Sequence, residues 1–257
     1  MPRLRSAWLL AAPLLFASAA AADVAPGTDG QSDARGRARP APVAHAAHVE
    51  RLGTSVRGLP IRAVEVGTAR KPRADLLVVG CIHGNEPAGM AVAQRLRTTL
   101  ASRPVDAWIV GDLNPDGRAA NTRVNADLVD LNRNFPWRWR PQFTPGNPQY
   151  SGQRALSEPE SRAAYDLILR IRPRVTIWFH QPLGLVDDSG GRPAVERRFS
   201  RLSGLPLRRL ARYHGSATSW QNHTVPGSAA FVVELPPGRL SARSVARLAA
   251  AAQALAG

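Results

Sequence analysis

The sequence predicts a three-layer α/β/α sandwich built on a mixed, largely parallel sheet in a single domain. Short apolar runs alternate along the chain with segments whose apolar residues recur at helical spacing. Strands separated by helices are typical of sheets that are covered by helices on both faces. The chain has 257 residues, of which 44% are hydrophobic, so it is long enough and apolar enough to bury a core.

The first half of this domain begins with strands. Residues 61–66 alternate apolar and polar side chains, which is typical of a half-buried strand. Residues 76–81 and 107–110 are continuous apolar runs, as expected for strands buried on both faces. Between them Pro87 suits the first turn of a helix. The inner face of this helix is expected at Met90, Ala93, Leu96 and Leu100.

The second half opens with a long excursion over residues 114–154, which is rich in Asn, Pro, Gly and Trp. Ser157 and Glu160 then have the spacing of a capping box and predict the start of a helix. The remaining expected elements are a strand over 175–179, a strand over 229–234 and a last amphipathic helix with its apolar stripe between 245 and 255.

The N-terminus indicates export. Arg3 and Arg5 precede an apolar run from residue 7 to 22, which ends in small residues before Asp23. This is the pattern of a cleaved signal peptide, so we expect residues 1–22 to direct the protein to the periplasm, the cell wall or the medium. Residues 23–48 have the composition of a flexible linker, which leaves 49–257 as the folded domain. No later segment is apolar enough to span a membrane, so no stable insertion is expected after cleavage.

Composition excludes some classes and leaves others open. Cys81 is the only cysteine, so an intrachain disulfide and a Cys-rich zinc module are both ruled out. The net charge of +15 favours anionic partners, such as nucleic acid or an anionic cell envelope, or reflects a solvated arginine-rich surface. No basic motif interleaved with aromatic residues is present, so a nucleic-acid partner is not expected.

Polar residues with metal-binding chemistry stand where predicted strands end. His83 and Glu86 follow the strand at 76–81, His180 ends the strand at 175–179, and Glu234 ends the strand at 229–234. The carboxyl ends of parallel strands form the ligand crevice of such sheets. Two histidines and two glutamates would suffice for a metal held by His₂Glu together with a free general base. This ligand set suits zinc and also admits cobalt or nickel.

An ordered set of motifs extends this interpretation. The segments are HGNEPAG at 83–89, NPDGR at 114–118, DLNRNFP at 130–136, SEPES at 157–161, HQP at 180–182 and VVELP at 232–236. The chain thereby resembles the zinc carboxypeptidases of the carboxypeptidase A superfamily. Within that superfamily it is most similar to the murein peptide amidases, which cut the γ-D-glutamyl–diaminopimelate bond of cell-wall stem peptides.

The resemblance implies a role for each matching residue. One Zn²⁺ would be held by His83, Glu86 and His180, and Glu234 would be the general base. Arg123 would stabilise the oxyanion of the tetrahedral intermediate. The resemblance further implies that Asn132 and Arg133 bind a free carboxylate of the substrate and that Asp130 orients the imidazole of His83.

Two departures from the family pattern bear on the site. Leu128 stands where the family usually has glycine, and this substitution is expected to alter the turn that carries Arg123. Carboxypeptidases also place a tyrosine over the substrate from a mobile loop. The corresponding region, 213–228, contains Tyr213, His214, Trp220 and His223, and none of them aligns unambiguously. Trp137 and Trp139 are equally consistent with a platform for sugar or peptide and with simple packing.

The leading hypothesis is an exported zinc metallopeptidase that acts on bacterial cell-wall peptides. Two other enzymatic readings stay open, a carboxypeptidase that removes C-terminal residues from L-peptides and a deacylase of N-acyl amino acids. A catalytically inactive wall-binding protein is the non-enzymatic alternative, although such a protein would have no need of Glu234. The sequence carries no indication of the oligomeric state.

Overall fold

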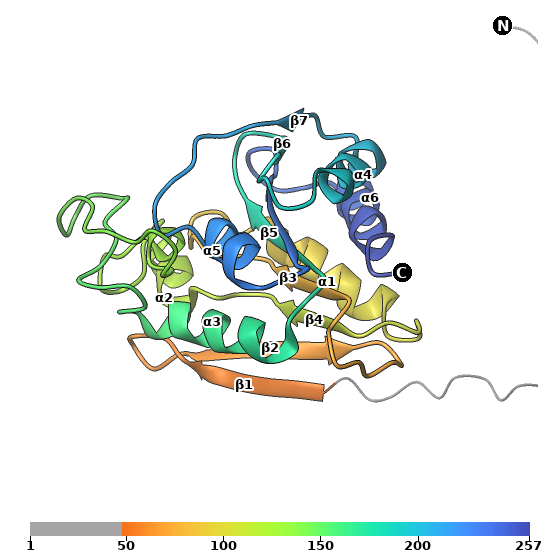
Figure 1. Cartoon of the computed structure of the whole chain (residues 1–257), viewed down its shortest axis with the longest axis horizontal. Helices are drawn as coiled ribbons and strands as arrows, with labels where there is room; N and C mark the ends of the chain where they lie inside the picture. The colour runs from red at the N-terminus through yellow and green to blue at the C-terminus, as the bar shows by residue number, and fades with distance from the viewer. Residues whose placement is uncertain (1–47) are drawn as a thin grey trace, which may run out of the picture. The chain divides into compact units, whose positions relative to one another are not determined.

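The structure is a computed structural model that describes residues 48–257. The expected signal peptide lies outside these residues, as does the expected linker except for His48, which begins the first strand. An eight-stranded sheet runs through the domain and carries helices on both faces (Figure 1). The predicted fold class is therefore confirmed. In the described part of the chain, no helix combines the length and apolar character needed to cross a membrane.

The sheet is mixed, with a parallel centre. Its strands are β1 (His48–Thr54), β2 (Pro60–Val66), β3 (Leu76–Val79), β4 (Ala107–Val110), β5 (Val175–His180), β6 (Leu185–Asp187), β7 (Leu207–Arg208) and β8 (Ala229–Glu234). Their order across the sheet is β1-β2-β4-β3-β5-β8-β6-β7. Strands β4, β3, β5 and β8 run parallel, whereas β2 and β6 pair antiparallel with the two sides of this group. The carboxyl ends of the four central strands therefore share one edge.

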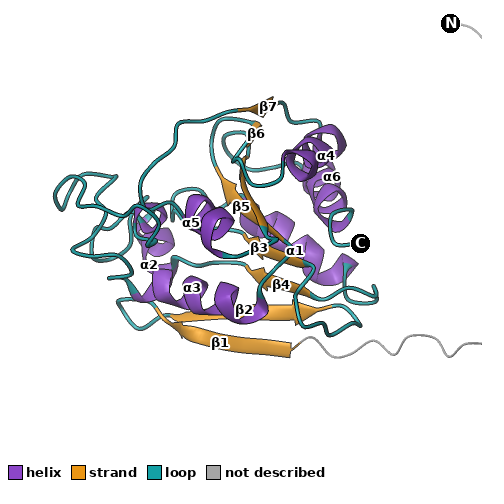
Figure 2. Ribbon diagram, viewed as in Figure 1, coloured by secondary structure: helices purple, strands orange, loops and turns teal. Residues whose placement is uncertain are grey.

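The helices form the two outer layers (Figure 2). They are α1 (Gly89–Thr99), α2 (Pro115–Ala120), α3 (Pro159–Ile171), α4 (Pro193–Ser203), α5 (Ala217–Thr224) and α6 (Ala242–Gln253), with a 3₁₀ turn, η1 (Leu131–Arg133). One core cluster joins α1, α4 and α6 to the sheet, and the other joins α3 and α5 to the opposite face.

Strand β3 shows why a strand at the centre of the sheet can be apolar at every position. Leu76 and Val78 pack into the core cluster beneath α1, whereas Leu77 and Val79 pack into the cluster beneath α3. All four side chains are almost completely buried. Each contributes about 1.5–3 kcal/mol of burial free energy, so a strand covered on both faces cannot tolerate polar residues.

Most predicted elements are present. The predicted capping box at 157–160 was wrong, although a helix does begin there. Helix α3 has Glu158 as its N-cap, with no side-chain cap. Ser157 instead donates to Glu158 and accepts from Asn134, while Glu160 accepts from the backbone N–H of Val56. Tertiary contacts thus take up the groups that would have formed the capping box. The edge strands β1 and β7, the short strand β6 and the helices α2, α4 and α5 were not predicted.

The excursion over 114–154 contains α2 and η1 and is otherwise irregular. Asn125 organises its central turn by accepting the backbone N–H groups of Asp127 and Val129 at 3.1 and 3.0 Å. The Nδ2 group of Asn125 donates to Glu158 and Glu160 at the start of α3. Two glutamates of the SEPES segment therefore fix a turn that lies more than thirty residues earlier in the chain.

Leu128 lies in this turn with φ at 63°, in the left-handed region that glycine enters without penalty. Its side chain is 46% exposed, and its N–H still donates to Asn125 O at 3.1 Å. The turn therefore keeps its hydrogen bonds with leucine present, and the substitution costs conformational free energy.

Replacing Leu128 with glycine should stabilise the protein by about 1 kcal/mol, because the strain of a left-handed leucine exceeds the entropy cost of glycine. Thermal unfolding should then shift upward by roughly 2–4 °C. Leu59→Gly is a matched control, because this leucine is similarly exposed and its φ is not positive. The control should be destabilised, and an L128G protein that melts no higher than wild type would contradict the strain argument.

Candidate active site

Three strand ends bring the candidate metal ligands together. His83 and Glu86 follow β3, and His180 is the last residue of β5. Glu234 ends β8 directly opposite His180 in the parallel register. Gly84 allows the turn after β3 to lie against α2, since a Cβ there would stand 1.9 Å from the backbone carbon of Gly117. The four residues therefore meet at the carboxyl edge of the sheet.

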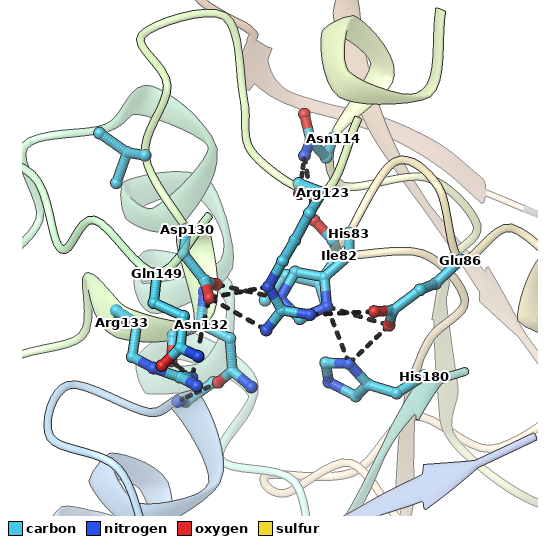
Figure 3. Close-up of polar contacts among 12 residues, drawn as sticks. Ile82, His83, Glu86, Asn114, Arg123, Asp130, Asn132, Arg133, Gln149 and His180 are labelled. Carbon is cyan, nitrogen blue, oxygen red and sulfur yellow. Dashed lines mark hydrogen bonds and ion pairs between the residues drawn. The ribbon is translucent and has the colours of Figure 1, made fainter. Parts of the chain in front are cut away.

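The three candidate ligands converge closely (Figure 3). Glu86 Oε2 lies 2.9 Å from Nδ1 of His83 and 2.9 Å from Nδ1 of His180. The two Nδ1 atoms are 3.1 Å apart, and all three side chains are buried. One nitrogen from each ring and one carboxylate oxygen thus point to a common position.

This arrangement fits a bound cation. Nε2 of His83 lies 3.0 Å from Asp130 Oδ1, which fixes Nε2 as the protonated nitrogen and leaves a lone pair on Nδ1. A lone pair on Nδ1 facing a second ring nitrogen and a carboxylate is repulsive unless a proton or a metal ion lies between them. Two imidazoles and one carboxylate are also the protein ligands of a catalytic zinc site that keeps a position open.

A buried carboxylate, Asp130, and one arginine, Arg123, flank the trio. Arg123 donates to Glu86 Oε1 at 3.0 Å and, through two nitrogens, to Asp130 Oδ2 at 3.0 and 3.1 Å. Burial alone would raise the pKa of Glu86 and of Asp130, but the contacts of each with His83 and the neighbouring hydrogen bonds hold each pKa well below its usual range. Both carboxylates are therefore ionised, and Arg123 is held with its guanidinium facing the cavity.

Glu234 stands apart from this network. Its Oε2 is buried and has no hydrogen-bond partner among the described residues. Burial, together with the charge of Glu86, raises the pKa of Glu234 to about 7. A carboxylate that is poorly solvated and carries a pKa close to neutrality is suited to accept and return a proton.

Asn132 and Arg133 line the same cavity from η1. Asn132 Oδ1 accepts the backbone N–H of Ala217 at 2.9 Å, so the group it can offer to a ligand is its amide N–H. Arg133 is 4% exposed, and its Nε has no partner within the described chain. The ring of Tyr213 lies over its guanidinium at 3.9 Å. Both residues therefore present donors that suit a carboxylate.

These groups share one cavity of about 550 Å³. All the sequence-predicted site residues except Asp130 line it, and Asp130 lies behind His83. Within the predicted loop region 213–228, Tyr213 is the tyrosine that reaches this cavity, whereas His214 and His223 line a neighbouring one. The volume is sufficient for a small peptide-like ligand.

Several residues that hold the site in place were not predicted to have a role. Asn114 caps α2 and donates to the backbone carbonyls of Ile82 and Arg123, which ties the two loops of the site together. Gln181 accepts from the N–H of Ala88 and donates to the carbonyl of Pro236, which ties β5 to α1 and to the segment after β8. Both belong to quoted motifs, but neither has side-chain chemistry that signals catalysis.

Comparisons with known proteins agree with this geometry. The family model described as zinc carboxypeptidase matches residues 41–182. Murein peptide amidase A of Vibrio campbellii is 29% identical over 199 residues, which cover 72% of this chain and 78% of that protein. Murein peptide amidase A of Escherichia coli is 31% identical over 150 residues, covering 54% of this chain and 61% of the relative.

Solved structures show the same fold. The crystal structure of murein-tripeptide amidase MpaA from Escherichia coli superposes with a TM-score of 0.68 at 28% identity, covering 86% of this chain and 97% of that one. Carboxypeptidase A from Helicoverpa armigera gives a TM-score of 0.70 at 17% identity, with coverage of 82% and 68%, and shows the fold alone. By the family match and by this geometry, the chain is a hydrolase that belongs to the zinc carboxypeptidase family.

Proposed function

We propose that this protein hydrolyses an amide bond in bacterial cell-wall stem peptides, of the γ-D-glutamyl–diaminopimelate type. The observation that carries the proposal is one cavity in which His83, Glu86 and His180 converge and Glu234 stands nearby, with Arg133 on the wall. The similarity to two proteins named murein peptide amidase A supports the choice of substrate.

One Zn²⁺ ion would be held by His83, Glu86 and His180. When bound there, zinc supplies a Lewis acid that polarises the amide carbonyl and lowers the pKa of water. Asp130 keeps the His83 ring in the tautomer that offers Nδ1 as a ligand. Glu86 is held ionised, so it brings the negative charge that a divalent cation requires.

The protein side chains then divide the remaining work. Glu234 takes a proton from the attacking water and delivers it to the leaving amine. Arg123 donates hydrogen bonds to the oxyanion as charge develops on the former carbonyl oxygen. Asn132 and Arg133 bind the free carboxylate of the leaving residue, and this contact sets the scissile bond in register with Glu234.

The site of action proposed for this enzyme is outside the cytoplasm. The support is the signal-like pattern of residues 1–22, and the strongly basic composition would favour approach to an anionic wall. Expression of the full chain with cell fractionation tests this, and a mature protein beginning at Asp23 outside the cytoplasm is expected. Retention of an uncut chain in the cytoplasm would overturn it.

Zinc should stabilise the folded chain if the trio binds it. At a free zinc concentration about 100 times the Kd, ligand linkage predicts a rise in Tm of roughly 5–10 °C. His180→Ala should abolish most of this rise, since it removes one of three protein ligands. His48→Ala is the matched control at an exposed position on β1 and should respond as wild type does. An equal zinc response in H180A and wild type would place the metal elsewhere.

Glu234→Gln should lower kcat for L-Ala-γ-D-Glu-diaminopimelate by about 10²–10⁴-fold and keep the zinc-dependent rise in Tm. Because the base must be ionised, wild-type activity should fall on the acid side of neutrality. Mass spectrometry of the products measures both effects, with Glu50→Gln at a surface ion pair as the unaffected control.

The same assay separates the alternatives. Release of diaminopimelate by wild type alone supports the proposal. Removal of C-terminal residues from an L-peptide panel instead would assign a general carboxypeptidase. Release of acyl groups from N-acyl amino acids would assign a deacylase. A zinc-loaded protein that cleaves none of these would be a wall-binding protein.

A further inference from the structure

A second cavity of about 460 Å³ adjoins the candidate active site. Arg212, Tyr213 and Ser219 line both cavities and so form the boundary between them. None of the candidate metal ligands lines the second cavity, and neither does Glu234. The contact between Tyr213 and Arg133 places the boundary on the side of the proposed carboxylate site. The second cavity therefore continues from the end of the site that would hold the leaving residue.

The walls of the second cavity are cationic. Three arginines and two histidines contribute to it, namely Arg138, Arg209, Arg212, His214 and His223, and no carboxylate side chain does. Arg212 donates to Asp187 Oδ2 at 2.7 Å, so its charge is largely compensated. In the described residues, no acidic group forms an ion pair with Arg138 or Arg209. These two guanidinium groups supply the uncompensated positive charge.

The cavity has a preformed aromatic side. The rings of Trp137 and His223 stack at 4.2 Å with 14° between their planes. His223 Nδ1 lies 2.7 Å from Ser219 O, and His214 Nδ1 lies 3.1 Å from Arg138 O, so both rings are anchored to the backbone. Each histidine thus turns its Nε2 atom away from the backbone contact, where it is available to a ligand. Aromatic rings held by the backbone, beside exposed arginines, suit a carboxylate at the end of an apolar stem.

We infer that the second cavity is a subsite for a distal carboxylate on the side chain of the leaving residue. The inference rests on the proposed function, because the orientation of the leaving residue follows from Arg133. Ser219 is the smallest of the three residues that line both cavities, so an extended side chain would cross the boundary beside it. Arg138 and Arg209 recognise the carboxylate beyond it and set the preference for a residue that carries acid at both ends. Diaminopimelate has this chemistry, and lysine, which lacks the second carboxylate, does not.

The test compares substrates that differ only in that carboxylate. Zinc-loaded wild type is assayed with L-Ala-γ-D-Glu-meso-diaminopimelate and with L-Ala-γ-D-Glu-L-Lys. Wild type should favour the first in kcat/KM. Arg209→Gln and Arg138→Gln should each reduce this preference by about tenfold, mainly through KM, because a charge-assisted hydrogen bond is lost. Cleavage of the lysine substrate should be unchanged in both variants.

Arg201→Gln serves as the matched control, since Arg201 is exposed on α4 and lines neither cavity. It should keep the wild-type preference. Equal loss of activity toward both substrates in R209Q and R138Q would indicate a structural role and overturn the subsite. An unchanged preference in both variants would overturn it as well.

A second substrate pair separates this inference from the proposed function. Two L-Ala-L-Ala peptides end in L-2-aminopimelate or in L-norleucine, which differ by the same distal carboxylate. If wild type cleaves only this pair, the murein assignment fails. The subsite is still supported in that case if wild type prefers the aminopimelate peptide and R209Q reduces the preference. If neither pair is cleaved, calorimetry measures the affinity of the Glu234→Gln protein for the same peptides. Equal affinities for the two peptides of each pair would refute the subsite.

Discussion

The site depends on keeping two carboxylates ionised inside the protein. Glu86 and Asp130 are both buried, which raises the pKa of a carboxyl group, and contacts with His83 lower the pKa of both, together with His180 at Glu86 and Arg123 at Asp130. His83 and Arg123 each contact both acids, so the four groups form a closed network. Removing one member would leave a buried charge without its partner, which is far more costly than losing a surface ion pair.

That network constrains the backbone far from the candidate metal site. Asp130 and Arg123 lie on the irregular segment after α2, which has no regular secondary structure of its own to fix them. Asn114 ties this segment to the loop that carries His83, and Asn125 ties it to two glutamates at the start of α3. Amide side chains are well suited to this task because each can donate and accept at the same time. The SEPES segment therefore contributes to the site by holding the turn at Asn125 in place through Glu158 and Glu160.

The strands and their ends were predictable because burial on both faces leaves a plain signal, as the run before His83 and the run before His180 illustrate. Strands β6 and β7 were not, because they have only three and two residues. The edge strand β1 was not either, because none of its seven residues is fully buried. The candidate metal ligands were inferred from chemistry and motif order, and the structure brings the three side chains together. Asn125 and Gln181 could not be inferred, since their roles follow from contacts between segments distant in sequence. Tyr213 could be placed only once the fold set its ring against Arg133.

The cavity of the candidate active site holds three buried polar atoms that have no hydrogen-bond partner in the described protein: Oε2 of Glu234, Nε of Arg133 and Nε2 of His180. An unpaired buried polar group costs about 1–3 kcal/mol, so a core built for stability alone would not retain three of them around one space. Glu234 and Arg133 are of opposite charge, yet they are not paired with each other. In the proposed mechanism, their separation keeps one group free to exchange a proton and the other free to bind an anion. The stability lost at this cavity is therefore best understood as the consequence of keeping both groups available to a substrate.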